Sequence, residues 1–320
     1  MMPASIPTTR IRIDRIDLAE LRYRISTPVP MDALVRSIAA VGLMSPPILL
    51  QGSKGLTIVS GFRRISALQR LEVQAVDARL LEANTWRRCA MLAVADNALQ
   101  RPLNPMETAR CLALLASTVD DAKALGEMAR NLGLDIHPSQ FQKSLALNRL
   151  PEPIQRAVIS GIITPAMALE LGRLGSCDAL RMTELFVELR PSLGKQREIL
   201  VLGREIAKRE GISICQVLAH DRMLAILQAE TPDTNPKTAE LRKALKQRRF
   251  PALYQAEEAF SACREKLKLP SGVQLLPPAQ FEGLTYQFVL PIQSISDLKN
   301  HRDTLTRLLE EPFLKTILDR

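Results

Sequence analysis

The sequence has few aromatic residues and no long apolar run. Of its 320 residues, one is Trp, three are Tyr and eight are Phe. The cores must therefore be built mainly from Leu, Ile, Val and Ala, which is typical of a helix-rich protein. No apolar run approaches the ~18 residues of a membrane-spanning helix, and the N-terminal stretch lacks the apolar core of a signal peptide. We therefore expect a soluble, cytoplasmic protein with no membrane partner.

Metal-binding and catalytic patterns are also missing. The five cysteines form no CxxC motif, and the three histidines, His137, His220 and His301, lie far apart in the sequence. A structural zinc site usually shows closely spaced Cys and His ligands. The spacing therefore supports neither a zinc site nor a Ser-His-Asp triad.

Positive charge is in excess. The chain has 43 Lys and Arg against 34 Asp and Glu, a formal net charge of +9, and a pI of about 9.6. Such a balance favours a polyanionic partner, nucleic acid first and an anionic membrane surface second. Much of the excess lies in residues 237–268, where nine Lys and Arg stand against four Glu. A solvated helix face explains that segment as well as a nucleic-acid contact does.

The first part of the chain alternates between helix and strand patterns. The apolar spacing predicts helices over 31–43 and 62–71, a hairpin over 47–59 and a third strand over 76–82. We expect the first dozen residues to form a loose arm. Together these elements make a small α/β domain, residues 1–95.

From Pro105 onward the apolar period is helical. Residues 120–134 and 137–150 predict two helices joined by a turn that contains Gly133, which is the arrangement of a helix-turn-helix. One face of the second helix carries Ser139, Gln142, Lys143 and Ala146. A polar face with small residues and no acid suits the major groove of DNA, although a plain helical hairpin with a solvated face explains it equally well.

The end of the chain changes character again. Further helices run to residue 228, residues 229–238 form a polar linker with two prolines, and strands are predicted over 272–278 and 284–292 before a helix over 294–311. Two strands and one helix are too few to bury an apolar face alone, so we expect this module to form a homodimer. The predicted class is α+β, mostly α. The predicted domains are an N-terminal α/β domain (1–95), a helical DNA-binding domain (96–228), a linker (229–238) and a C-terminal dimerisation module (239–320).

The turn before the second predicted helix has the composition of an anion site. Gly61 allows close approach of the backbone, and Arg63 and Arg64 supply planar, permanently charged donors at a helix start. A solvated turn with two surface arginines is the simpler interpretation of these residues by themselves.

Six collinear segments resemble the ParB family of plasmid and chromosome partition proteins. The resemblance extends over about residues 11–175, and the last 110 residues match the family only in layout. It includes a glycine and double-arginine motif, an acid-Asn pair followed by Leu-Asn-Pro-x-Glu, and a helix-turn-helix. The matching segments are 16–24, 37–50, 58–71, 96–109, 128–151 and 157–171.

The resemblance implies a function. A member of the family would bind a short palindromic, centromere-like site on double-stranded DNA and work with a ParA-type ATPase, and it would be associated with the nucleoid or a plasmid. Its N-terminal domain would bind CTP and Mg²⁺. The nucleotide-binding residues would be Ser60, Gly61, Arg63, Arg64, Asp96 and Asn97, with Asn97 also at the metal. The DNA-binding residues would be Ser139, Gln140, Gln142, Lys143 and Arg149.

Two departures from the family pattern affect these expectations. Phe62 stands where the family usually has Glu or another polar residue, and a hydrocarbon ring neither orders a water nor accepts a proton. Any CTPase activity would therefore be weak. Met167 and Leu169 replace the usual His and Arg, which removes a contact to DNA phosphate. A ParB-like transcriptional regulator or nucleoid-associated protein without nucleotide activity is the alternative.

A third class of function is a catalytic relative of the N-terminal fold, such as a sulfiredoxin-like or kinase-like enzyme or a nuclease. Sulfiredoxin-like chemistry needs a cysteine beside the phosphate turn, and the nearest in sequence is Cys89. The residues therefore favour a DNA-binding protein over an enzyme.

Overall fold

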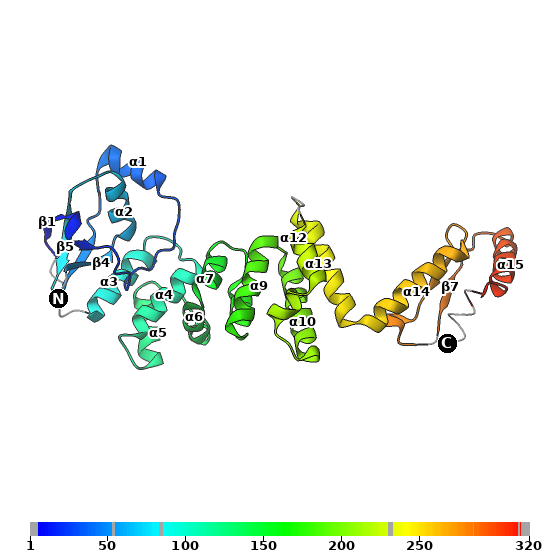
Figure 1. Cartoon of the computed structure of the whole chain (residues 1–320). Helices are drawn as coiled ribbons and strands as arrows, with labels where there is room; N and C mark the ends of the chain where they lie inside the picture. Colours follow the sequence, from blue (N-terminus) through cyan, green and yellow to red (C-terminus); the bar gives the residue numbers. More distant parts are fainter. Residues whose placement is uncertain are drawn as a thin grey trace. The chain divides into compact units, whose positions relative to one another are not determined.

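The chain divides into two compact units, Met1–Leu193 and Gly194–Arg320 (Figure 1). The structure is a computed structural model that describes residues 6–52, 55–82, 86–229, 233–283, 285–312 and 314. The first unit runs across the predicted boundary between residues 95 and 96. The expected class, α+β with mostly α, is confirmed.

A five-stranded mixed sheet opens the first unit, with the strand order β1-β5-β3-β4-β2. β3 and β4 form the predicted antiparallel hairpin, and β5 lies parallel to β3. Residues 8–12, which we expected to be a loose arm, instead pair antiparallel with β5 as an edge strand. The strands are β1 (Thr8–Arg12), β2 (Ile16–Asp17), β3 (Ile48–Gly52), β4 (Gly55–Ser60) and β5 (Ala75–Leu81).

Helices cover both faces of this sheet. Because side chains alternate along a strand, Leu49 and Ile58 join one core while their neighbours Ile48 and Val59 join another. The first core is closed by α1 (Asp32–Val41) and α2 (Phe62–Arg70), the second by α3 (Trp86–Ala98) (Figure 1). The sequence did not predict α3, which spans the expected domain boundary.

The second core continues into the helical part. It contains Leu112 of α4 (Pro105–Ala116), Leu125 of α5 (Ala122–Asn131) and Phe141 of α6 (Phe141–Asn148). The α/β part and the helix-turn-helix part therefore share one hydrophobic core. The predicted helix over 137–150 is divided: a 3-10 turn, η2 (Pro138–Gln140), precedes α6. Three further helices complete the unit, α7 (Glu152–Ile159), α8 (Pro165–Leu171) and α9 (Ser176–Leu189).

The second unit holds a helical part and a small α/β part. Residues 230–232 of the expected linker lie outside the described residues, and its last five residues form the start of α13. β6 and β7 pair antiparallel, with Leu275 opposite Phe288. After α10 (Leu193–Glu210), which begins at the boundary, the elements are α11 (Ile214–Leu218), α12 (Asp221–Gln228), α13 (Thr234–Arg249), α14 (Pro251–Leu267), β6 (Gln274–Leu276), η3 (Ala279–Phe281), β7 (Gln287–Val289) and α15 (Ile295–Leu309).

Four of the six basic residues of α13 have acidic partners on α10. Glu198 accepts from Arg242 Nε at 2.7 Å and from Lys246 Nζ at 2.9 Å. Two further pairs, Arg249–Glu205 at 2.6 Å and Arg248–Glu210 at 2.5 Å, follow along the same helices. These positive charges of α13 therefore form ion pairs that hold α13 against α10. The pairing favours a structural role over a nucleic-acid contact for residues 237–268. Within the described part of the chain, no helix combines the length and apolarity needed to cross a bilayer.

Candidate nucleotide and DNA sites

One pocket brings together all six residues expected to bind nucleotide. It has a volume of about 290 Å³ and lies between the start of α2 and the end of α3. Ser60, Gly61, Arg63 and Arg64 reach it from the β4–α2 turn, and Asp96 and Asn97 reach it from α3. Ile25, Ser26, Leu34, Gln100 and Arg101 also line it, together with Phe62.

Gly61 is required by the shape of the turn. Its φ of 100° lies in the left-handed region, and an added Cβ would come within 2.8 Å of the Pro47 Cβ. Gly61 is also the N-cap residue of α2, and no side chain caps that helix. The first turn of α2 therefore presents backbone N–H groups and the positive end of the helix dipole beside the pocket.

Arg64 is held inside the protein. Its Nη2 donates to Asp96 Oδ2 at 2.8 Å, and its Nη1 donates to the carbonyl of Ser45 at 2.9 Å. Asp96 also accepts from the Ser60 hydroxyl and, at 2.7 Å, from Gln100 Nε2. These contacts join the β4–α2 turn to α3. Asp96 and Arg64 thus have a positioning role whether or not they touch a ligand.

Arg63 differs from Arg64. Within the described residues, its Nε is buried and has no hydrogen-bond partner. A buried guanidinium N–H without an acceptor is costly, so an anionic acceptor at this position would be favourable. Arg63 therefore differs from Arg64, whose Nη1 and Nη2 are both engaged by groups of the protein.

Asn97 has one side-chain oxygen to offer. Its Nδ2 donates to the Ala93 carbonyl at 2.8 Å, one helical turn back, which directs the amide along α3. An amide oxygen is a suitable Mg²⁺ ligand when phosphate oxygens complete the coordination. The carboxylate of Asp96, by contrast, already accepts hydrogen bonds at both oxygens.

A buried ion pair supports one wall of the pocket. Arg101 donates to the Glu107 carboxylate at two points, and Glu107 also accepts from the backbone N–H of Thr27 at 2.9 Å. Burial disfavours the ionised carboxylate, but Arg101 and the N–H groups of Thr27 and Asn104 outweigh it and lower the pKa of Glu107 to about 2. Asn104 and Glu107 form the capping box of α4. That sequence signature could have placed Arg101 beside the site.

The expected DNA-binding residues all lie on the surface. Ser139 and Gln140 belong to η2, Gln142 and Lys143 to α6, and Arg149 is the C-cap of α6; all five are exposed. Buried Phe141 and Leu147 hold the opposite side of α6 in place. The polar face of α6 is therefore accessible. The Ser139 hydroxyl lies 2.7 Å from His137 Nδ1, so part of its hydrogen-bonding capacity is used locally.

Three of these residues line one groove between α6 and α8. The groove has a volume of about 470 Å³, and no acidic residue lines it. Gln142, Lys143 and Arg149 form one side, and Leu169 and Arg173 form the other. Sequence reasoning missed Arg173, which follows Leu169 by one helical turn and so supplies a cation beside the position where the family pattern is lost. The sequence signal that could have found Arg173 is its position four residues after Leu169, which places the two residues on the same side of a helix.

Glycine sets how closely α6 and α8 approach. A Cβ on Gly172 would lie 2.3 Å from the Leu150 Cδ2, so the end of α8 packs directly against the residue that follows Arg149. This contact fixes Arg149 and Arg173 on facing sides of the groove. None of Lys143, Arg149 and Arg173 has an ion-pair partner among the described residues.

No protein-family model matches the chain. A probable plasmid-partitioning protein ParB of Thermus thermophilus is 26% identical over 210 residues, which cover 56% of this chain and 69% of that protein. This is a similarity in sequence over most of the relative's length.

Solved structures are similar in part. The C-terminally truncated chromosome-partitioning protein ParB from Caulobacter crescentus, complexed with CTP-gamma-S, is 19% identical, with a TM-score of 0.27, over 56% of this chain and 98% of that one. The same protein complexed to the centromeric parS site is 16% identical, with a TM-score of 0.33, over 59% and 96%. A Pnob8-like ParB-N domain is 13% identical, with a TM-score of 0.37, over 77% and 99%.

The collinear sequence motifs and the curated relative point the same way, and the two motifs expected at the nucleotide site meet in one pocket. The chain is similar to a ParB partitioning protein, at low sequence identity.

Proposed function

We propose that this protein is the site-specific DNA-binding component of a partition system. The observation that carries the proposal is the exposed polar face of α6 beside a groove that three cations and no acid line. The resemblance supplies the expected target, a palindromic centromere-like site on double-stranded DNA, and the expected partner, a ParA-type ATPase.

The side chains of α6 suit two different contacts. Gln142 carries an amide that can donate to and accept from a base edge in the major groove. Lys143 and Arg149, with Arg173 across the groove, carry charges suited to phosphate oxygens. Sequence discrimination would therefore depend on Gln142, whereas the cations would add affinity for any duplex.

The pocket at the β4–α2 turn would hold a nucleotide. Its geometry fits phosphate: Gly61 leaves room for close approach, the first turn of α2 offers N–H groups, and Arg63 has an unpartnered buried N–H in the part of the chain described. Asn97 would hold Mg²⁺ through its side-chain oxygen. The bound nucleotide would supply the triphosphate, and the residues of this chain would bind and orient it.

Phe62 disfavours hydrolysis, because its hydrocarbon ring cannot activate water. The ring lies between the two cores of the α/β part, packing against both. We therefore propose nucleotide binding with little turnover. A regulator that binds DNA without nucleotide is the second candidate, and Phe62 is the observation that favours it.

The second unit would form the homodimer. Ile295, Leu298 and Leu309 are exposed on α15, and by the helical period they share one face. An unpartnered apolar stripe on a short helix beside a two-stranded sheet is suited to a second copy of the chain.

The test is selection of bound fragments from the host DNA by the full chain. We expect one or a few palindromic sites with the native protein and loss of that selectivity with Gln142→Ala. Calorimetry with CTP and Mg²⁺, with and without the selected DNA, then separates the two candidates. Fragments recovered in proportion to their abundance would contradict site-specific binding, and absence of CTP binding would leave the regulator.

A further inference from the structure

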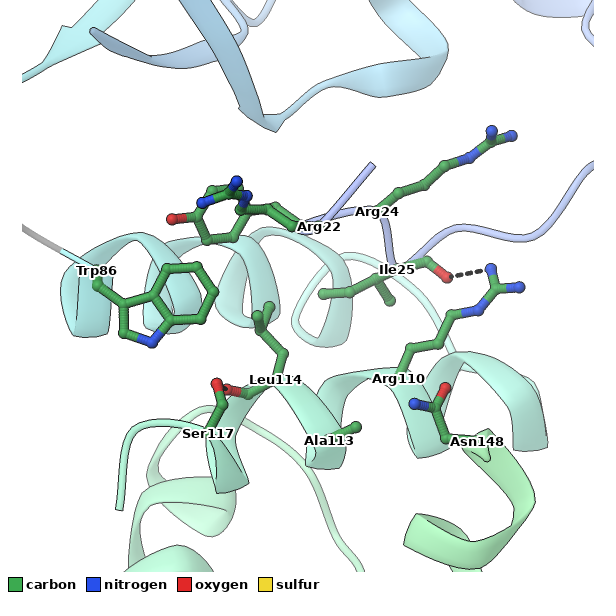
Figure 2. Close-up of a pocket in the computed structure, with 10 residues that line it drawn as sticks. Arg22, Arg24, Ile25, Trp86, Arg110, Ala113, Leu114, Ser117 and Asn148 are labelled. Carbon is green, nitrogen blue, oxygen red and sulfur yellow. Dashed lines mark hydrogen bonds between the residues drawn. The ribbon is translucent and has the colours of Figure 1, made fainter. Parts of the chain in front are cut away.

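A second pocket of the first unit adjoins the proposed nucleotide pocket, with which it shares Ile25. It has a volume of about 370 Å³ and is bordered by residues 22–25, the start of α3, α4 and the end of α6. Figure 2 shows Trp86 at one end of it, the guanidinium groups of Arg24 and Arg110 at the other, and Leu114 between them. Its two ends therefore differ in chemistry.

One end is cationic and lacks counter-charges. Arg22 pairs with Glu20 at 2.6 Å, but within the described residues neither Arg24 nor Arg110 has a carboxylate partner. Arg110 Nη1 donates to the carbonyls of Ile25 and Ser26, both at 3.2 Å, which fixes the guanidinium at the pocket. Burial, followed by the charge of Arg24, lowers the pKa of Arg110. Two cations that repel each other, Arg110 held by hydrogen bonds and Arg24 exposed, favour an anionic ligand between them.

The other end is aromatic and partly open. Trp86 is 39% exposed and its ring centroid lies 5.2 Å from that of Tyr23. Leu114 is buried beside it and lines the same pocket. Trp, Tyr and Arg are the residue types that dominate binding energy at protein–protein interfaces, and here they meet in one hollow.

The pocket is distinct from the proposed DNA surface. Asn148 is the residue of α6 that lines this pocket. Gln142, Lys143 and Arg149 line the groove beside α8 instead, and the pocket and the groove share no lining residue. A DNA backbone could satisfy the arginines but has no apolar side group to place against Trp86 and Leu114. An acidic peptide with an apolar or aromatic side chain satisfies both ends.

We propose that this pocket is a docking site for an acidic segment of a partner protein. A carboxylate of that segment lies between Arg24 and Arg110, and a neighbouring apolar side chain packs on Trp86 and Leu114. The site adds a protein-binding surface in the first unit that meets the proposed nucleotide pocket only at Ile25 and shares no residue with the groove of α6.

Trp86 makes the test direct, because it is the single tryptophan of the chain. The full chain is titrated with a short peptide of alternating glutamate and phenylalanine while tryptophan fluorescence is recorded. We expect a saturable change with this peptide and none with its lysine-for-glutamate counterpart. Replacing phenylalanine by alanine should weaken binding, because the apolar end then stays empty.

Two exposed arginines provide matched variants. Arg24→Ala should weaken peptide binding about tenfold, the usual effect of removing one charge-assisted contact. Arg36→Ala, on the exposed side of α1 and outside the pocket, should leave it unchanged. No fluorescence change at millimolar acidic peptide, or equal losses in both variants, would overturn the proposal. So would a fluorescence change with duplex DNA that Arg24→Ala abolishes and Lys143→Ala does not, since the pocket would then be a DNA contact.

Discussion

Arg101 and Glu107 form a two-point ion pair, with Nη1 to Oε2 and Nη2 to Oε1 both at 2.7 Å. The Glu107 side chain is only 2% exposed, and its carboxylate also fixes the backbone of Thr27 and caps α4. This single carboxylate thus connects the segment before α1, the end of α3 and the start of α4. It supports the wall of the proposed nucleotide pocket without being expected to touch a ligand.

The first prediction concerns the acid stability of this pair. The folded pKa of Glu107 is about 2, below its ordinary value of 4.5, so its contribution is complete above pH 4.5 and is lost as the pH falls toward 2. The difference corresponds to ~3 kcal/mol of unfolding free energy. Denaturant unfolding, followed by Trp86 fluorescence over this pH range, should show the loss in the native protein and a flatter profile in Glu107→Gln. Glu152→Gln, whose side chain is 78% exposed, is the control and should keep the native profile.

The second prediction separates the two arginines of the β4–α2 turn. Arg63→Ala should abolish or strongly weaken CTP binding, measured by calorimetry with Mg²⁺, while unfolding stability changes little, because its Nε has no partner within the described structure. Arg64→Ala should lower stability by ~2 kcal/mol, since it removes contacts to Asp96 and to the Ser45 carbonyl. Equal stability losses in both variants would argue against the distinction.

The third prediction concerns Arg173. Arg173→Ala should weaken binding to cognate and scrambled duplexes by the same factor and reduce the slope of log affinity against log salt by about one. Fluorescence anisotropy with labelled duplexes measures both quantities. Arg156→Ala on α7, whose arginine lies outside the groove and pairs weakly with Glu152 at 3.9 Å, should behave like the native protein. An Arg173 variant with native slope would remove this residue from the DNA surface.

The fourth prediction concerns the apolar stripe of α15. Leu309 is 71% exposed, and an aspartate there would place a charge in the proposed dimer contact. Leu309→Asp should yield monomers in light scattering at concentrations where the native chain is dimeric. Asn300→Asp changes an exposed residue on another side of the same helix and should leave the mass unchanged. A Leu309→Asp variant that stays dimeric would exclude this face as the contact.

Short-range signals were sufficient for much of the fold. The hairpin of β3 and β4 and the helix after Gly61 follow from alternation, turn residues and helical period, all of which act within a few residues. The pairing of residues 8–12 with β5 was not predictable in this way, because it depends on a partner about seventy residues away. Helix α3 was missed because apolar residues occur around most of its circumference, so its sequence shows no clear helical period.

For the candidate sites, too, local sequence signals identify some residues, whereas long-range contacts decide the roles of others. The residue types at Gly61, Arg63 and Gln142 were sufficient to nominate them. The internal contacts of Arg64 depend on α3 and on the Ser45 carbonyl, which sequence spacing does not reveal. Arg173 lies at the proposed DNA surface because Gly172 packs on Leu150 and sets the distance between α6 and α8, a long-range contact that the sequence does not reveal.

The salt dependence of duplex binding tests the central claim most directly. If the polar face of α6 and its groove contact DNA phosphates, the affinity of the full chain for duplex DNA should fall steeply and linearly on a log–log plot as salt rises. Three cations at the groove correspond to a slope of about −2.7, at ~−0.9 for each phosphate neutralised. A slope near zero, or no binding at low salt, would contradict the account.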